Sequence, residues 1–190
     1  MKKVMTLLIV FIPLFIYSQN NPAKFYDKNK TSYPIDGEIL NLCSNFAKSE
    51  INKDSLINEI YVLFNEYRKY VGLDTLILDT NLSKAAEIQS KYCLSIKEVT
   101  HENKNFPTPK DRLNKTVNGD IKWTGEIITI SDFLIGLCRN RSLSESVLDS
   151  FFNSSAHKNI IEQSDSTKIG ISVQKFKDIV YTVIIFGKNK

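Results

Sequence analysis

Histidine is among the scarcest residues of this chain, with two in 190 residues. Glycine and proline are also few, at 7 and 5. This shortage leaves no long stretch with the composition of a flexible linker. Hydrophobic residues make up 42% and charged residues 24%, which is the balance of a globular domain. The composition therefore indicates one domain with a modest appendage.

Apolar runs of about 20 residues, which a membrane-spanning helix needs, are absent. The run from Val4 to Tyr17 is shorter, follows Lys2 and Lys3, and ends before Ser18. Such a run is typical of an export signal cleaved after a small residue. We expect a signal peptide over residues 1–18, a secreted or periplasmic product, and no membrane span in the mature protein. An uncleaved N-terminal anchor is the alternative.

A large excess of positive charge is absent too. The formal net charge is +4, and two of the lysines lie within the expected signal. Nucleic-acid binding relies on clustered basic residues. We therefore expect no nucleic-acid partner.

Cysteines number three, at Cys43, Cys93 and Cys138. Their spacing matches no zinc template. An exported protein could pair two of them and leave one over. Cys93 and Cys138 stand among apolar neighbours, which favours buried thiols. We expect no essential disulfide framework.

Two familiar hydrolase motifs are incomplete. His101-Glu102 begins like a zinc-protease helix, but no second histidine follows four residues after the first. Ser154 and Ser155 precede His157 without a Gly-x-Ser-x-Gly elbow. Neither class of hydrolase is favoured.

Hydrophobic periodicity predicts helices over residues 54–71, 80–95 and 142–153, the last opened by a capping box of Ser142 and Glu145. Alternating and β-branched runs predict strands at 169–173 and 179–186, joined by residues 175–178. Residues 97–124 look loop-rich, 132–139 could be helix or strand, and 39–46 could be a short helix. We expect an α+β fold with a lead-in segment at 19–53 and the main domain at 54–190.

The functional candidates centre on the two histidines. His101 follows the second predicted helix, His157 follows the third, and Gly125-Glu126 lies between them. Two neutral imidazoles and one carboxylate could hold Zn²⁺ and leave a fourth position open. Without metal, the same groups could bind a polar ligand or move protons. Each histidine could also be an isolated surface residue.

The two histidines stand within a series of short motifs. In chain order these are Asn65-Glu-Tyr67-Arg68, Gly72-Leu73, Leu76-Ile-Leu78-Asp79, Leu82 with Ala85-Ala86, His101, Pro109-Lys-Asp-Arg112, Gly125-Glu126, Val147 to His157, Ile169-Gly-Ile and Ile185-Phe186-Gly187. Taken in this order, they resemble the CAP superfamily of cysteine-rich secretory, antigen 5 and pathogenesis-related 1 proteins, in its bacterial extracellular form. The resemblance implies a three-layer α-β-α sandwich with a central antiparallel sheet. It also implies a cleft lined by His101, Glu126, Ser154 and His157, which in some members binds divalent metal.

The chain departs from the family pattern at four positions. Ile127 replaces the asparagine of the Gly-Glu-Asn motif, and Phe151 replaces the usual tryptophan. Ser154 stands where a second acid is usual, and Asn159 falls one residue short of the usual asparagine after the histidine. The leading hypothesis is a secreted binding module whose cleft takes a small ligand or a divalent metal such as zinc, with no cofactor required. The partner could be a small molecule, a lipid or an extracellular protein. Alternatives are a metal-dependent hydrolase with Glu126 as general base and a structural surface domain with a vestigial cleft.

We predict a mature N-terminus at or near Gln19, because Ser18 ends the apolar run. Mass spectrometry of the protein exported by its native host measures this directly. Recovery of an intact chain that begins at Met1 and stays in the membrane would refute cleavage.

Overall fold

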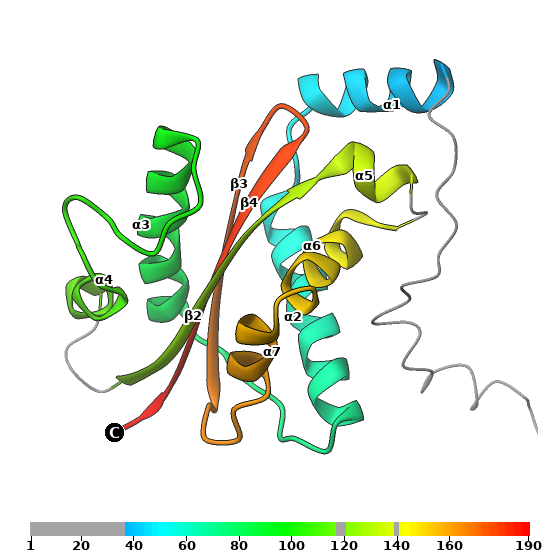
Figure 1. Cartoon of the computed structure of the whole chain (residues 1–190). Helices are drawn as coiled ribbons and strands as arrows, with labels where there is room; N and C mark the ends of the chain where they lie inside the picture. The colour runs from blue at the N-terminus through cyan, green and yellow to red at the C-terminus, as the bar shows by residue number, and fades with distance from the viewer. Residues whose placement is uncertain (1–36, 117–120, 139–140) are drawn as a thin grey trace, which may run out of the picture.

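The computed structural model describes residues 37–116, 121–138 and 141–190. Its elements form three layers, with a sheet between two groups of helices (Figure 1). In chain order they are α1 (Gly37–Lys48), α2 (Lys53–Tyr70), β1 (Ile77–Leu78), α3 (Thr80–Ile96), α4 (Pro109–Thr116), β2 (Ile121–Asp132), α5 (Phe133–Cys138), α6 (Leu143–Phe152), α7 (Ser155–Ile161), β3 (Lys168–Phe176) and β4 (Ile179–Asn189). The expected α-β-α sandwich is confirmed.

The sheet has the strand order β1-β3-β4-β2. β4 pairs antiparallel with both β2 and β3. The short β1 pairs parallel with β3, so the sheet is mixed rather than wholly antiparallel as expected. β2 lies at one edge, which lets groups from the two helical layers approach each other around it.

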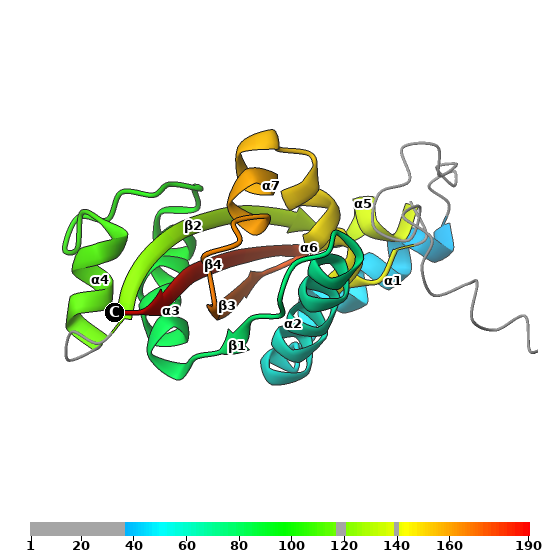
Figure 2. The same ribbon diagram turned by 90° about the horizontal axis from the view of Figure 1, so that it is seen from below.

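Each face of the sheet has its own hydrophobic core because side chains alternate along a strand. On β2, Ile127 belongs to the core shared with α2 and α6, whereas Ile128 belongs to the core shared with α3 and α4. Ile184 and Val183 of β4 divide in the same way. The helices divide accordingly, with α2, α6 and α7 on one face of the sheet and α3 and α4 on the other (Figure 2).

The first two main helices form where hydrophobic periodicity predicts them. In α2, Leu56 and Ile60 are buried, and Gly72 follows the helix with a left-handed φ of 80°. The Asn52 side chain caps the start of α2 by accepting from the Ser55 amide at 3.0 Å. In α3 one face of the helix is buried, and it is made up of Leu82, Ala85, Ala86, Gln89 and Cys93.

The third expected helix is α6, whose capping box of Ser142 and Glu145 is formed. Residues 97–124, expected to be loop, contain α4 and the start of β2. Polar residues on the exposed side of α4 dilute its apolar signal, and a β-bulge interrupts the alternation of β2 between Trp123 and Gly125. The ambiguous segment 132–139 contains the helix α5. The β3–β4 turn is shorter than expected, at Lys177-Asp178.

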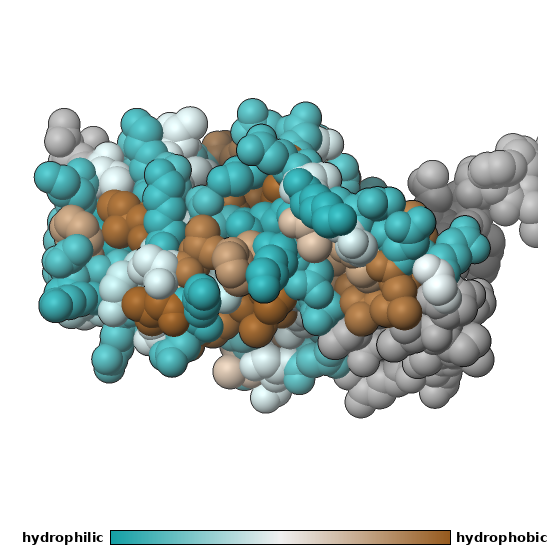
Figure 3. Space-filling model, turned by 90° about the horizontal axis from the view of Figure 1, so that it is seen from above, coloured by the Kyte–Doolittle hydropathy of each residue, from teal (hydrophilic) through white to brown (hydrophobic). Residues whose placement is uncertain are grey.

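α1 falls within the segment expected to be a lead-in and packs against α5. Apolar side chains also reach the surface on this side of the molecule (Figure 3), and on α1 Leu40 and Leu42 are 54% and 48% exposed. No helix among the described residues is long and apolar enough to cross a membrane. The expected signal at 1–18 lies outside the described residues.

Gly170 sets how closely α3 approaches the sheet. A Cβ at this position would lie 2.1 Å from the Leu82 carbonyl carbon and 2.3 Å from the Ser83 nitrogen, both backbone atoms. We predict that Gly170→Ala lowers the free energy of unfolding by about 1–3 kcal/mol, because the helix must move away. Gly37→Ala is the matched control, since a Cβ added there would meet no atom within 4 Å. Urea unfolding of both variants decides the point, and equal stability would contradict the packing argument.

Candidate functional site

A buried carboxylate organises the site. Glu126 extends from β2, its residue surface is 4% exposed, and both of its oxygens have partners. Oε2 pairs with Arg112 Nη2 at 2.5 Å, and Oε1 lies 2.9 Å from His101 Nδ1. A charge removed from water needs such compensation to be tolerated. The sequence-predicted pair of His101 and Glu126 is therefore in direct contact.

Arg112 does more than neutralise Glu126. It lies on α4 and is fully buried. Its Nη1 donates to the backbone oxygens of His101, at 3.3 Å, and Phe106, at 3.1 Å. One guanidinium thus fixes both the carboxylate and the loop that carries the histidine. The sequence pattern singled out Arg112 only as part of a loop motif, because a lone arginine carries no sign of its burial.

Gln89 fixes the same loop from α3. Its buried side-chain amide donates to the backbone oxygens of Thr100 and, at 3.2 Å, Glu102. Its Oε1 accepts from Asn103 Nδ2 at 3.2 Å. Gln89 lies on the buried face of α3 and was not a site candidate. A glutamine on such a face is the signal that could have marked this role, since a buried amide needs partners.

The contact with Glu126 fixes the tautomer of His101. An ionised carboxylate only accepts hydrogen bonds, so Nδ1 must be the protonated ring nitrogen. In the neutral ring, Nε2 then keeps a free lone pair. The His101 side chain is 55% exposed, so this nitrogen can meet a ligand.

His157 comes from the opposite face of the sheet, on α7. Ser154 caps this short helix by accepting from the His157 backbone amide at 3.4 Å. The ring packs edge-on against Phe151, with centroids 5.5 Å apart. Its Nδ1 is buried and has no hydrogen-bond partner within the described part of the chain, while the residue as a whole is partly exposed.

Gly125 lets α7 lie close to β2. A Cβ here would come 2.5 Å from Ile160 Cγ2 on α7. This close approach holds α7, which carries His157, against β2. The close packing of α7 on β2 thus explains why glycine stands at this position of the Gly-Glu motif.

Arg68 and Tyr67 hold the far end of α7. Arg68 is fully buried and donates to the backbone oxygens of Ile161 at 2.6 Å and Gln163 at 3.0 Å. The Tyr67 hydroxyl donates to the Glu162 carboxylate. Neither residue was a site candidate, although both lie in a segment that carried the family resemblance.

The two histidines lie close enough to interact electrostatically. Burial lowers the pKa of His157, and the nearby His101 lowers it further. The folded protein therefore resists protonating this ring. As pH falls below the usual histidine value of about 6.5, the unfolded chain takes up the proton first, so His157 contributes stability above that pH and loses it below.

Ser154, the remaining candidate, plays a smaller part, because its hydroxyl serves as the α7 cap. Glu102 is exposed on the loop after α3, and Asp111 is exposed on α4. Trp123 of β2 is 40% exposed.

The donor set does not amount to a three-ligand metal centre. Among the residues described, no group of three or more His, Cys, Asp or Glu side chains could hold a metal ion. The two imidazoles remain available, but both Glu126 oxygens already have partners. Metal binding by His101, Glu126 and His157 stays a prediction.

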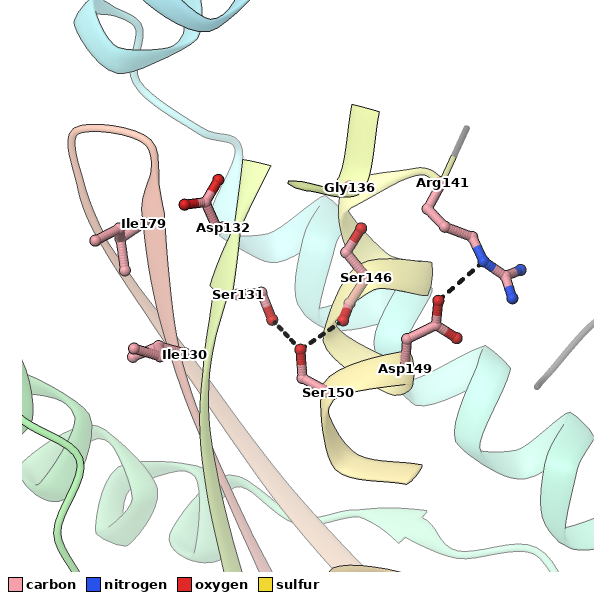
Figure 4. A pocket seen from close by; sticks show the side chains of 9 residues that line it. All are labelled: Ile130, Ser131, Asp132, Gly136, Arg141, Ser146, Asp149, Ser150 and Ile179. Carbon is pink, nitrogen blue, oxygen red and sulfur yellow. Dashed lines mark hydrogen bonds and ion pairs between the residues drawn. The ribbon is translucent and has the colours of Figure 1, made fainter. Parts of the chain in front are cut away.

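A separate cavity of about 340 Å³ lies where β2 ends, next to α5 and α6. Figure 4 shows Arg141 paired with Asp149, at 2.9 Å, and Ser131 close to Ser150 on its wall. None of the expected site residues lines this cavity.

The model of the cysteine-rich secretory protein family, CAP, matches residues 61–186. The chain belongs to the CAP family. The match lies inside the domain expected at 54–190 and includes His101, Glu126 and His157. No curated protein matches this CAP protein.

Solved structures share the CAP fold at low sequence identity. An outer surface protein of Borrelia burgdorferi is 23% identical with a TM-score of 0.61, over 75% of this chain and 98% of that protein. An extracellular SCP-domain protein of Bacillus anthracis is 20% identical with a TM-score of 0.58, over 83% of this chain and 45% of that one. A cysteine-rich secretory protein of Staphylococcus aureus is 19% identical with a TM-score of 0.55, over 74% and 40%. This chain thus spans less than half of the last two.

We predict that His101→Ala raises the pKa of His157, because one cause of its lowered value disappears. NMR titration of the His157 ring in wild type and variant measures the change. Glu102→Ala, which removes an exposed charge beside His101, is the control and should shift the titration less. An unchanged midpoint in His101→Ala would show that the two rings do not share a cleft.

Proposed function

We propose that this CAP protein is an exported binding module whose cleft between His101 and His157 takes a small polar ligand. The observation that carries the proposal is the orientation of His101, whose Nδ1 is held by buried Glu126 while Nε2 is left open. A preorganised acceptor of this kind costs little to order when a ligand binds.

His157 supplies the second contact. The residue is partly exposed and its ring resists protonation, so with Nδ1 buried the ligand would meet Nε2. Two open imidazole nitrogens suit a ligand that carries a hydroxyl, an acid group or a divalent ion. A lipid with a polar headgroup or an extracellular protein with such a side chain offers the same chemistry.

The hydrolase alternative receives less support. A general base needs a carboxylate that can accept a proton from the reacting water. Glu126 is buried, and its oxygens are engaged by Arg112 and His101. That arrangement favours Glu126 as the group that positions His101. Turnover that disappears in Glu126→Gln would promote the hydrolase.

Export is part of the proposal. The positive and apolar segment before Ser18 supports it. Two of the proteins that share the fold are described as an outer surface protein and an extracellular protein. Membership of the CAP family does not depend on whether the protein is exported.

Zn²⁺ alone is a suitable probe of the cleft, because two imidazoles bind it even without a third protein ligand. We predict weak to moderate binding of one ion and a loss of about tenfold or more in His157→Ala. Binding should weaken on acidification from about pH 7.5 to pH 5, because protonated imidazole cannot coordinate. The lowered pKa of His157 should preserve its own contribution to a lower pH than an ordinary histidine would.

Calorimetry gives the affinity, and NMR of the labelled full chain shows which rings respond. Asn159→Ala, an exposed change on the same helix, is the matched control. If both rings stay unperturbed by Zn²⁺, or if His157→Ala and the control bind equally, the cleft is not a binding site. The structural surface domain then becomes the better account.

A further inference from the structure

We propose that Cys43 and Cys138 form a disulfide in the exported protein and so fasten α1 to the CAP domain, while Cys93 remains a thiol. All three cysteines are free and buried in the structure. Cys43 lies on α1 and Cys138 on α5, and these two helices pack against each other.

The two helices run antiparallel. Figure 1 shows α1 above α5, with the end of α1 that leads to α2 lying over the start of α5. At that end, the rings of Phe46 and Phe133 stack with centroids 3.8 Å apart. Lys175 of β3 donates to the backbone oxygens of Ala47 and Ser49 and so fixes the same end.

The cysteines lie further along the same contact. Cys43 is three residues before Phe46, which puts both on one face of α1. Cys138 is five residues after Phe133 on α5. With antiparallel helices, those offsets of about 4.5 Å and 7.5 Å run in the same direction, so the two residues differ by about 3 Å in position along the contact. They are 8% and 9% exposed, as expected of side chains enclosed between two elements.

Electrostatics agrees with this placement. Burial is the main cause of the raised pKa of Cys43, but Asp132, Asp178 and Cys138 also contribute. Cys93 has different neighbours, since its thiol contacts Thr100 and Gln89 beside the histidine loop. Cys93 therefore does not share the surroundings of Cys43 and Cys138. It belongs to the hydrophobic core on the face of the sheet that α3 covers.

The bond would form by thiol–disulfide exchange. One thiolate attacks a disulfide of an oxidising partner, such as a dithiol oxidoreductase or glutathione disulfide, and expels one thiol of that partner. The second cysteine then attacks the mixed disulfide and releases the partner's other thiol. The protein loses two protons and two electrons, and the partner disulfide takes them up. Burial raises the pKa of Cys43, so exchange is expected before α1 docks.

The consequence is a covalent tie between α1 and the rest of the domain. α1 lies outside the residues that match the family model, and its contact with α5 is small compared with the packing of the main helices. The cores on the two faces of the sheet do not depend on this bond. The tie is thus compatible with a domain that needs no disulfide framework.

The test uses the full chain, folded with glutathione disulfide present, then alkylated without reductant and mapped by mass spectrometry. We expect a peptide that joins Cys43 to Cys138 and a labelled Cys93. Cys93→Ala should retain the bond, whereas Cys138→Ser should leave Cys43 open to the label after denaturation. Label on both Cys43 and Cys138 in the wild type would overturn the proposal, and so would a bond that includes Cys93.

Limited proteolysis tests whether the disulfide restrains the local opening of α1. Cleavage within residues 37–48 should be at least about tenfold slower in the oxidised chain than in the reduced chain, because local opening of α1 is restricted. Cys138→Ser should cleave at the reduced rate whether or not reductant is present. Equal cleavage of oxidised and reduced wild type would show that the bond does not hold α1 in place.

Discussion

The buried ion pair of Arg112 and Glu126 is the interaction on which the site depends. Glu126 is enclosed in the domain, where a carboxylate without partners would carry a large desolvation cost. Arg112 compensates one oxygen, and His101 contacts the other. The same guanidinium also binds the backbone of the histidine loop. Removing either charge would leave the opposite charge buried without its ionic partner, so the pair couples the position of His101 to the stability of the fold.

The position of β2 in the sheet explains how this pair comes to lie where the two helical layers approach each other. β2 is an edge strand, with α4 on one side and α7 on the other. Glu126 faces the side of α4, while Gly125 allows α7 to approach closely from the opposite side. His101 and His157 therefore reach the edge from different layers. His101 lowers the pKa of His157, which is consistent with the two rings lying near each other.

Elements with a strong period were predictable from the sequence, and those with mixed signals were not. The inner face of α3 and the capping box of α6 follow directly from spacing. β2 escaped notice because its bulge breaks the alternation, and α4 because its exposed side is charged. The pairing of His101 with Glu126 followed from a family resemblance. The roles of Arg112 and Gln89 depend on burial by distant segments, which no local pattern reports.

The protonation pattern of the His101 ring tests the central claim most directly. A long-range proton–nitrogen NMR spectrum of the neutral ring distinguishes the two tautomers. The proposed cleft requires a protonated Nδ1 and an unprotonated Nε2, because the Glu126 carboxylate can only accept a hydrogen bond. Glu126→Gln should lose that preference. A neutral His101 with its proton on Nε2 in the wild type would contradict the proposed organisation of the cleft.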